Sequence, residues 1–251
     1  MSTTESTPVP AATTVLISGA SRGLGLAVAT LLVERGLRVA GFARALTPEL
    51  QNLAEAHPDR VVCGAVDVTD QPAVEEFIAD AAQRLGHSFD GLVNNAAAGE
   101  YTMFVHARPA GIEQIITTNL LAPLLLTRLF TRGLLATGGR GRAVMVSSIC
   151  AHRGFAGHAV YSATKAGLEG ATRSLAHEFR DRLLINCVAP GFFASELSAI
   201  LDTDQVATIL RRTPVKRLTR SAEVATMIAT LLLDSSALTG QSIVIDGGLT
   251  A

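Results

Sequence analysis

The feature that most constrains the fold is a regular alternation of short apolar runs with longer segments of helical periodicity. The runs are rich in β-branched residues, which is typical of strands, and the segments between them are long enough for helical crossovers. The predicted strands cover residues 14–18, 38–42, 60–66, 91–94, 142–147, 184–189 and 242–246. The predicted helices cover residues 24–34, 48–56, 72–85, 109–135 (one long or broken helix), 159–179 and 222–233.

This order predicts one α/β domain with a doubly wound parallel sheet of seven strands over residues 13–251, after a flexible tail at residues 1–12. The strands are apolar on both faces, as in Val15-Leu16-Ile17, which indicates that helices cover both sides of the sheet. Ligands bind such sheets outside the carboxyl ends of the strands. We therefore expect the functional residues directly after strand ends.

Composition excludes several classes of protein. The chain is 48% hydrophobic and 17% charged with a net charge of -1, which gives no general attraction for nucleic acid or anionic lipid. Three cysteines without zinc-site spacing indicate reduced thiols inside a cell. The N-terminus lacks the pattern of a secretory signal, and the most apolar stretch, residues 120–130, is too short to span a bilayer. A cytoplasmic protein is expected.

The first predicted strand leads directly into a glycine-rich turn and then a helix. Glycines allow a tight turn and a close approach of the backbone to a ligand, and the start of the helix stabilises a pyrophosphate. An ordinary strand-to-helix loop can have the same pattern, but its place after the first strand favours dinucleotide binding. The expected contacts come from Gly19, Ser21, Arg22, Gly23, Leu24 and Gly25.

The end of the second predicted strand indicates which dinucleotide is bound. A carboxylate there binds the ribose 2′-hydroxyl of NAD, whereas an arginine suits the 2′-phosphate of NADP. This strand ends in Phe42-Ala43-Arg44, without a carboxylate. Arg44 and Arg22 together would bind a 2′-phosphate, so NADP(H) is the expected cofactor. The alternative is that both arginines are solvated surface residues.

A tyrosine and a lysine lie one turn apart in the predicted helix 159–179, in the run Tyr161-Ser162-Ala163-Thr164-Lys165. An adjacent ammonium is expected to lower the pKa of the Tyr161 phenol from its ordinary value and make it a general acid/base. Ser148, at the end of the preceding strand, can place a hydroxyl beside the phenol, and Asn119 lies two elements earlier. The Tyr/Lys spacing alone also fits two unrelated helix residues.

These residues resemble the classical short-chain dehydrogenases/reductases over about residues 13–251. The resemblance rests on the glycine turn followed in order by Ser148, Tyr161 and Lys165. It is completed by Asp67-Val68, Asn94-Asn95-Ala96, Asn119, Asn186, Pro190-Gly191 and Asp246-Gly247-Gly248. It implies a Rossmann fold and an NAD(P)(H)-dependent oxidoreductase that acts on carbonyl or alcohol groups.

The resemblance also implies a role for each residue. Tyr161 would give a proton to the substrate oxygen as hydride arrives from the nicotinamide, and Ser148 would hydrogen-bond the same oxygen. Lys165 would lower the pKa of Tyr161 and hold the nicotinamide ribose, and Asn119 would anchor a water that relays protons. The further cofactor contacts would come from Asp67, Val68, Asn94, Ala96, Pro190, Gly191, Phe193 and Ser195.

Three positions depart from the family pattern. Ala97 stands where the family usually has Gly, Ser195 where Thr is common, and Ser18 where Thr is usual. Both serines keep a hydroxyl group. The departures therefore bear on the shape of the pocket rather than on cofactor binding.

Residues 191–217 correspond to the family's substrate lid, and their apolar face favours a hydrocarbon or aromatic substrate, although ordinary helix packing gives the same pattern. His152 is either a polar contact or, with more weight, a solvated loop histidine. The expected substrate contacts are Ser148, Cys150, Phe155, Tyr161 and Phe192.

Arg182 matches a basic position at which acyl-carrier-protein reductases of this family dock their acidic partner, and Arg140 falls one residue from the second such position. Solvated surface arginines are the alternative. A basic rim suited to an acidic carrier would also include Arg211, Arg212, Lys216 and Arg217.

The leading hypothesis is therefore NADPH-dependent reduction of a 3-oxoacyl thioester, by a homotetramer or dimer built through the helices 109–135 and 159–179. The first alternative is a reductase or dehydrogenase of another small or cyclic ketone, or of a sugar or polyol alcohol. A non-catalytic NADP(H)-binding scaffold has less support, because scaffolds tend to lose the Tyr or Lys that this sequence retains.

Overall fold

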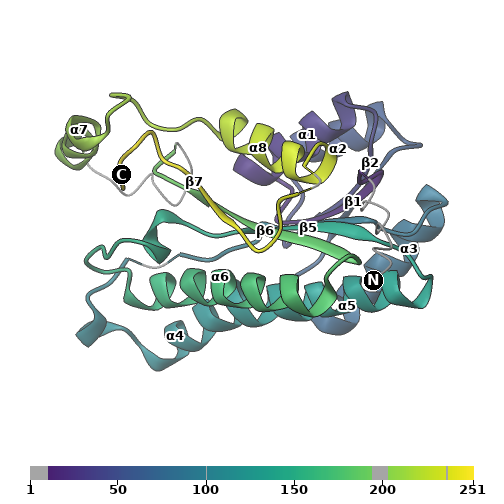
Figure 1. Cartoon of the computed structure of the whole chain (residues 1–251), viewed down its shortest axis with the longest axis horizontal. Helices are drawn as coiled ribbons and strands as arrows, with labels where there is room; N and C mark the ends of the chain where they lie inside the picture. Colours follow the sequence, from purple (N-terminus) through teal and green to yellow (C-terminus); the bar gives the residue numbers. More distant parts are fainter. Residues whose placement is uncertain (1–10, 100, 194–202, 236) are drawn as a thin grey trace, which may run out of the picture.

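The computed structural model describes residues 11–99, 101–193, 203–235 and 237–251. This part of the chain forms one seven-stranded sheet in the order β3-β2-β1-β4-β5-β6-β7 (Figure 1). The strands are β1 (Thr14–Ser18), β2 (Arg38–Ala43), β3 (Val61–Ala65), β4 (Gly91–Asn94), β5 (Gly141–Val146), β6 (Leu183–Pro190) and β7 (Ser242–Ile245). Every neighbouring pair is parallel, which confirms the predicted doubly wound α/β fold.

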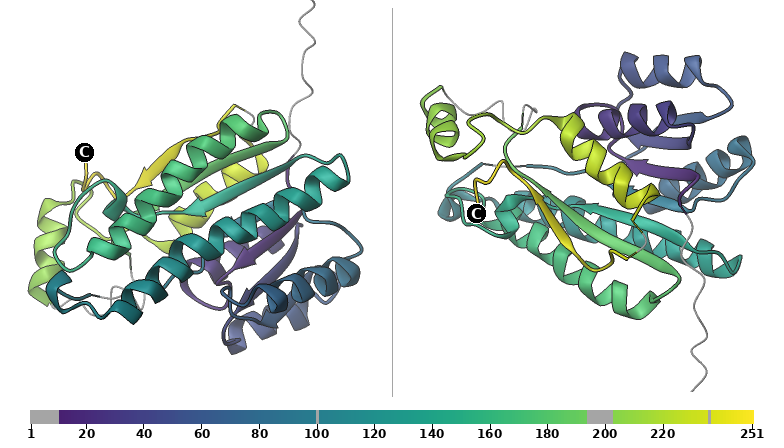
Figure 2. Two further views of the ribbon diagram at one scale, coloured as in Figure 1. Left: turned by 90° about the horizontal axis from the view of Figure 1, so that it is seen from below. Right: turned by 45° about the horizontal axis from the view of Figure 1, so that its top comes forward.

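Helices cover both faces of the sheet, as the two turned views in Figure 2 show. One face carries α1 (Gly23–Glu34), α2 (Pro48–Ala56) and α8 (Ser221–Leu233). The other carries α3 (Gln71–Leu85), α5 (Ala122–Ala136) and α6 (Ala159–Phe179). A hydrophobic core lies on each face of the sheet, and successive side chains of β1 point to opposite cores. Val15 and Ile17 pack toward α1, while Leu16 packs with Leu126 and Leu168 on the other face.

The segment predicted as one long or broken helix is broken. It consists of α4 (Pro109–Ile116), a π-helical turn at Thr117–Leu121, and α5. Pro123, in the first turn of α5, has no N–H to donate to the carbonyl of Asn119, and its ring crowds that carbonyl. The regular hydrogen-bond pattern is therefore interrupted at the turn that carries Asn119.

Other boundaries differ from the sequence-based ranges by one or two residues, for example at β5 and β6. Helix α7 (Thr203–Arg212) lies in the predicted lid, where the sequence suggested only an apolar face. Most of the predicted tail, part of the lid and Ser195 lie outside the described residues. None of the described helices is both long and apolar enough to cross a membrane.

All seven strands end at the same edge of the sheet. At the point where the strand order reverses, β1 lies between β2 and β4, and Ser18 is in register with both Phe42 and Asn94. The chain therefore brings the turn after β1 beside the segment after β4, and the turns after β5 and β6 lie further along the same edge.

Candidate active site

The glycine turn after β1 adopts a conformation that only glycine fits. Gly19 has φ +69°, and a Cβ atom there would lie 2.8 Å from the Cα of Ala96. A Cβ on Gly25 would lie 2.0 Å from the carbonyl oxygen of Gly19. Gly23 has φ +56° and would meet nothing within 4 Å, so open space lies beside this part of the turn.

The start of α1 suits an anion. No side chain caps the helix at Arg22, and its first turn contains no acidic residue. The N–H groups of the first turn and the helix dipole therefore face the open space at Gly23 without a competing carboxylate. The residues present fit the pyrophosphate of a dinucleotide.

Asn95 holds this turn, and the sequence analysis assigned it no role. Its Nδ2 donates to the carbonyl oxygen of Gly19 at 2.8 Å, while its main-chain N–H and that of Ala96 donate to Ser18 Oγ. Its neighbour Asn94 is 2% exposed, and its Nδ2 donates to Thr127 Oγ1 at 2.8 Å in the core. The side chain of Asn94 is thus directed away from the turn, and only its main chain lies at the strand end.

The segment after β2 lies against the same turn. Thr47 Oγ1 donates to the carbonyl oxygen of Ser21, and the N–H of Gly19 donates to Phe42 at the end of β2. Arg22 and Arg44, both exposed, therefore belong to neighbouring segments. After β3, Asp67 Oδ1 accepts hydrogen bonds from Thr69, and Val68 is buried.

The catalytic candidates come together between β5 and α6. Lys165 is 2% exposed, and its Nζ donates to the carbonyl oxygen of Val146 at 2.8 Å. The same Nζ lies 5.5 Å from the centre of the Tyr161 ring. Ser148 follows β5, and its hydroxyl lies close enough to Tyr161 to oppose the rise in the pKa of that phenol. The structure thus brings Ser148, Tyr161 and Lys165 to one place.

The ionisation of this pair differs from the expectation. Burial raises the pKa of the Tyr161 phenol well above its ordinary value, and the hydrogen bond with Ser148 opposes the rise. Burial also lowers the pKa of Lys165 to about 8. The prediction that Lys165 lowers the pKa of Tyr161 is therefore wrong for this structure, because burial dominates the pKa of the phenol and Lys165 is not among the groups that shift it.

Asn119 is fully buried in the π-helical turn and uses its amide group on Ala98. Its Nδ2 donates to the carbonyl oxygen of Ala98 at 2.7 Å, and its Oδ1 accepts from the N–H of the same residue at 2.7 Å. The side chain therefore holds the segment after β4 at the edge of the sheet.

A series of neighbouring aromatic rings begins at Tyr161 and continues through His158. Phe155 meets Phe192 edge to face, with ring centres 5.5 Å apart. His158 lies 6.1 Å from Tyr161 and 5.4 Å from Tyr101. The structure thus joins Phe155 and Phe192, both predicted substrate contacts, with two rings that the sequence analysis missed, since nothing in their local pattern pointed to a site.

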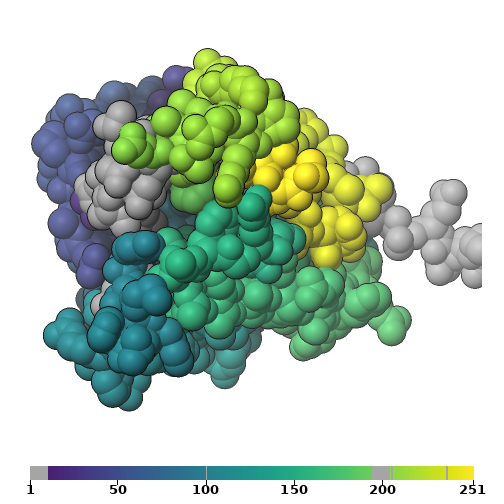
Figure 3. All heavy atoms as spheres, turned by 90° about the vertical axis from the view of Figure 1, so that its left-hand side faces the viewer, coloured from purple at the N-terminus to yellow at the C-terminus, as the bar shows by residue number. Residues whose placement is uncertain are grey.

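The remaining predicted contacts lie along the same edge. Cys150 is buried, and its N–H donates to Ser148 Oγ at 3.2 Å. Gly191 follows β6, where a Cβ would lie 2.6 Å from Asp246, so only glycine fits. Phe193 forms a bridge with Thr219. Figure 3 shows this face, with α7 in light green above the teal segment that precedes α4.

The basic residues do not form one rim on a single chain. Arg140 and Arg182 directly precede β5 and β6, so they lie at the opposite edge from Ser148. There Arg140 pairs with Asp181 at 3.0 Å, and Arg182 donates to the carbonyl oxygen of Gly138. The prediction of a rim that joins them to residues 211–217 is wrong, because parallel strands begin and end at different edges.

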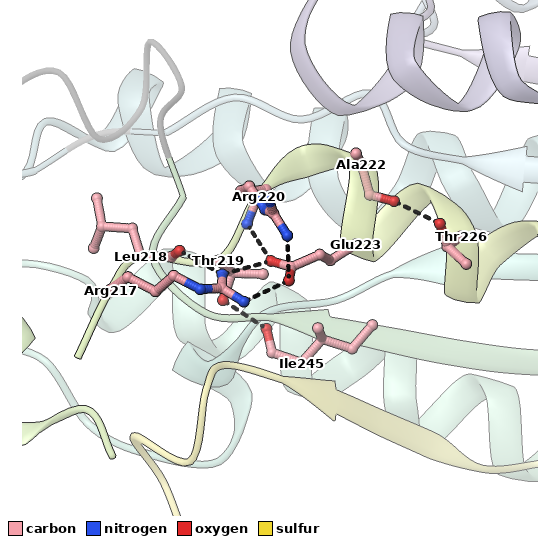
Figure 4. A network of polar contacts seen from close by, with 8 residues as sticks. All are labelled: Arg217, Leu218, Thr219, Arg220, Ala222, Glu223, Thr226 and Ile245. Atoms are coloured by element: carbon pink, nitrogen blue, oxygen red, sulfur yellow. Dashed lines mark hydrogen bonds and ion pairs between the residues drawn. The ribbon is translucent and has the colours of Figure 1, made fainter. Parts of the chain in front are cut away.

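Arg217 instead belongs to a local network at the start of α8 (Figure 4). Its Nη1 and Nη2 atoms donate to the two carboxylate oxygens of Glu223, at 2.9 and 2.7 Å. Glu223 also accepts from the main-chain N–H of Arg220 at 2.9 Å. Thr219 lies inside this network, and its N–H donates to the carbonyl oxygen of Phe192. The network therefore anchors the chain that follows β6.

Comparison with known proteins agrees with this geometry. The family model described as Enoyl-(Acyl carrier protein) reductase matches residues 19–250. The chain is 33% identical over 240 residues to 3-oxoacyl-(acyl-carrier-protein) reductase FabG of Escherichia coli (strain K12), which covers 93% of this chain and 96% of the relative. It is 32% identical over 234 residues to carbonyl reductase family member 4 of Xenopus tropicalis, with coverage of 93% and 96%.

Solved structures show the same fold. A short-chain dehydrogenase/reductase from Brucella melitensis, titled glucose/ribitol dehydrogenase, matches with a TM-score of 0.87 and 27% identity over 95% of this chain and 97% of that one. A 4-hydroxyisoleucine dehydrogenase complexed with NADH matches with a TM-score of 0.88 and 24% identity, over 95% and 98%.

A doubly wound sheet with a phosphate-binding glycine turn and a Ser/Tyr/Lys site defines an oxidoreductase that acts on carbonyl or alcohol groups with a nicotinamide cofactor. The chain belongs to the short-chain dehydrogenase/reductase family.

Proposed function

We propose that this chain is an NADPH-dependent ketoreductase that reduces a 3-oxoacyl thioester, held by an acyl carrier protein, to the 3-hydroxyacyl form in the cytoplasm. The observation that carries the proposal is the placement of Ser148 and Lys165 around the Tyr161 phenol, at the edge where the glycine turn opens. The printed name of the Escherichia coli relative supports the substrate class.

When bound, NADPH supplies the hydride that reaches the carbonyl carbon. Tyr161 gives its proton to the carbonyl oxygen, and the Ser148 hydroxyl donates a hydrogen bond to the same oxygen as negative charge develops there. The Tyr161 phenol carries its proton near neutral pH, as donation in the direction of reduction requires, and the rise in its pKa on burial makes it a weaker acid in this structure.

Lys165 and Asn119 support this chemistry. Lys165, held at Val146 O, would bind the nicotinamide ribose beside Tyr161. The side chain of Asn119 positions Ala98, next to Ala96 and the cofactor's expected path. A relay water at Asn119 stays a prediction.

The preference for NADPH rests on charge at the turn. Arg22 and Arg44 lie on segments that Thr47 and Ser21 join, and β2 ends without a carboxylate that would select the ribose hydroxyl of NAD. Two guanidinium groups at this place suit the 2′-phosphate of NADPH.

The carrier contact at Arg140 and Arg182 implies a second subunit. Arg140 precedes β5 and Ser148 follows it, so the two lie about 25 Å apart along the strand. A carrier docked at these arginines would serve the site of a neighbouring chain in the expected homotetramer or dimer.

A second candidate is reduction of a cyclic or aromatic ketone. The rings of His158, Tyr101, Phe155 and Phe192, which lead away from Tyr161, favour it, because aromatic rings pack edge to face or offset with one another.

A steady-state screen distinguishes these functions. The chain is assayed with NADPH and NADH against 3-oxoacyl thioesters, 2-enoyl thioesters, cyclic ketones and polyols. We expect the highest kcat/KM with NADPH and a 3-oxoacyl thioester. Turnover of a free ketone or an enoyl thioester without turnover of any 3-oxoacyl thioester would overturn the proposed substrate.

A further inference from the structure

Three consecutive residues, Val146 at the end of β5 and the two serines that follow it, lie against one face of α6. Tyr161, Lys165 and Glu169 are spaced four residues apart, so they lie on the same face of the helix. Lys165 Nζ donates to the carbonyl oxygen of Val146, and Ser148 lies near enough to Tyr161 to affect the pKa of its phenol. Glu169 accepts a hydrogen bond from Ser147 Oγ at 2.8 Å.

Glu169 is a buried carboxylate that carbonyl reduction does not use. It is 6% exposed, and its Oε1 lies 3.0 Å from Nε2 of His152. Burying a carboxylate is unfavourable unless hydrogen bonds compensate it, whereas an apolar residue would fill the same place without that requirement. The carboxylate at this position therefore suggests that Glu169 positions neighbouring residues through its hydrogen bonds.

His152 closes the turn that starts at Ser148. The N–H of Ala151 donates to the carbonyl of Ser148 at 2.9 Å, and the N–H of Cys150 donates to Ser148 Oγ. His152 ends this turn, and its side chain, 33% exposed, reaches back to Glu169 on α6. Both ends of the turn are thus fixed to the helix that carries Tyr161.

We propose that His152 and Glu169 are positioning residues, whose contact holds the turn 148–152 against α6 and so sets the Ser148 hydroxyl beside the Tyr161 phenol. Glu169 is the third point of attachment between β5 and α6, after Lys165 and Tyr161. The expected effect on kcat rests on the proposed carbonyl reduction, whereas the expected effect on the position of the turn 148–152 does not.

The kinetic test replaces His152, because this partly exposed side chain can change without emptying the core. His152→Ala removes the contact, and His152→Gln keeps an N–H donor for Glu169. His177→Ala is the matched control, an exposed histidine about 12 Å along α6 from Glu169. We expect kcat to fall about tenfold or more in His152→Ala, the ratio that corresponds to loss of a hydrogen bond to a charged group. NADPH affinity should change little and the melting temperature should fall by only a few degrees, and His152→Gln should regain most of the kcat and of the melting temperature.

A second readout needs no substrate. In a Cys63→Ser background, the reaction of Cys150 with an aromatic disulfide reagent reports opening of the turn, while fully buried Cys187 serves as a slow internal reference. We expect Cys150 to react about tenfold faster in His152→Ala and at the unchanged rate in His152→Gln and His177→Ala. If no carbonyl compound is turned over, the proposed function fails, but this measurement still tests the contact.

Two results would overturn the inference. One is a His152→Ala variant with unchanged kcat and unchanged Cys150 reactivity. The other is an equal loss in the alanine and glutamine variants together with weaker NADPH binding and a lower melting temperature, which would show a general structural role.

Discussion

The amine of Lys165 lies 5.5 Å from the centre of the Tyr161 ring, and it is fixed there by a hydrogen bond of 2.8 Å to the carbonyl oxygen of Val146. Burial shifts the two groups in the same chemical direction, toward their neutral forms, since the pKa of Tyr161 rises and that of Lys165 falls to about 8. The protein thus holds a protonated phenol beside an amine that loses its proton at mildly alkaline pH.

The first prediction concerns stability and pH. The pKa of Lys165 falls from 10.5 to about 8 on folding, so burial of its charge opposes folding below about pH 8. The opposition, on the order of 3 kcal/mol, is relieved as pH rises toward the unfolded pKa. Stability of the wild type should therefore rise relative to Lys165→Met between about pH 8 and pH 10.

Urea unfolding of both proteins across this range measures the effect. Loss of the hydrogen bond to Val146 changes the free energy of unfolding by an amount that does not depend on pH. The prediction therefore concerns only how the difference in free energy of unfolding between the two proteins changes with pH. A difference between wild type and Lys165→Met that stays constant with pH would contradict the assigned burial of the charge.

The second prediction concerns Asn119. Asn119→Ala leaves both main-chain groups of the partly buried Ala98 without their side-chain partners, which should lower the free energy of unfolding by about 1 to 3 kcal/mol. Asn52→Ala, at an exposed position of α2, is the matched control. Denaturant unfolding checks the values, and equal losses in the two variants would refute the structural role of the amide.

The third prediction concerns the cofactor. Arg44→Ala should weaken NADPH binding by about tenfold, the ratio for loss of a charged hydrogen bond, and leave NADH binding nearly unchanged. Arg38→Ala, at the start of the same strand, is the control. Fluorescence titration with both nucleotides gives the dissociation constants. Equal effects on NADPH and NADH would remove Arg44 from the 2′-phosphate site.

The fourth prediction concerns Glu223. Its hydrogen bonds with Arg217 and Arg220 hold the pKa of the carboxyl well below the ordinary value. A carboxyl with a depressed pKa stabilises the folded state above its unfolded pKa of about 4.3, and the stabilisation is lost as pH falls further. Glu223→Gln should lower the melting temperature near neutral pH, and the difference from wild type should shrink in acid. Glu76→Gln, exposed on α3, should show neither effect.

The seven-stranded parallel sheet with helices on both faces could be predicted because it depends on local pattern. The two-sided apolar runs predicted a covered parallel sheet, and the glycines predicted the turn that Gly19 and Gly25 now form. In the structure, Ser148, Tyr161 and Lys165, which the sequence analysis named as catalytic candidates, lie together at one edge of the sheet.

The remaining features depend on contacts between distant segments. Asn95 supports the glycine turn from another strand, and Glu169 meets His152 across a turn and a helix. The balance between burial and charge at Tyr161 depends on how tightly the whole site packs, which residue spacing does not give. Family position alone predicted a basic rim that joins Arg140 and Arg182 to residues 211–217, although Arg140 and Arg182 precede β5 and β6 and lie at the opposite edge of the sheet from Ser148.

The central claim is that Tyr161 gives the proton during carbonyl reduction. The most direct test compares Tyr161→Phe with Tyr101→Phe, a matched change at the other of the two tyrosines in the chain. In stopped-flow measurements of NADPH oxidation, Tyr161→Phe should lower the rate by at least about 100-fold, with NADPH affinity preserved, while Tyr101→Phe remains active. A Tyr161→Phe enzyme that oxidises NADPH at close to the wild-type rate would contradict the assignment.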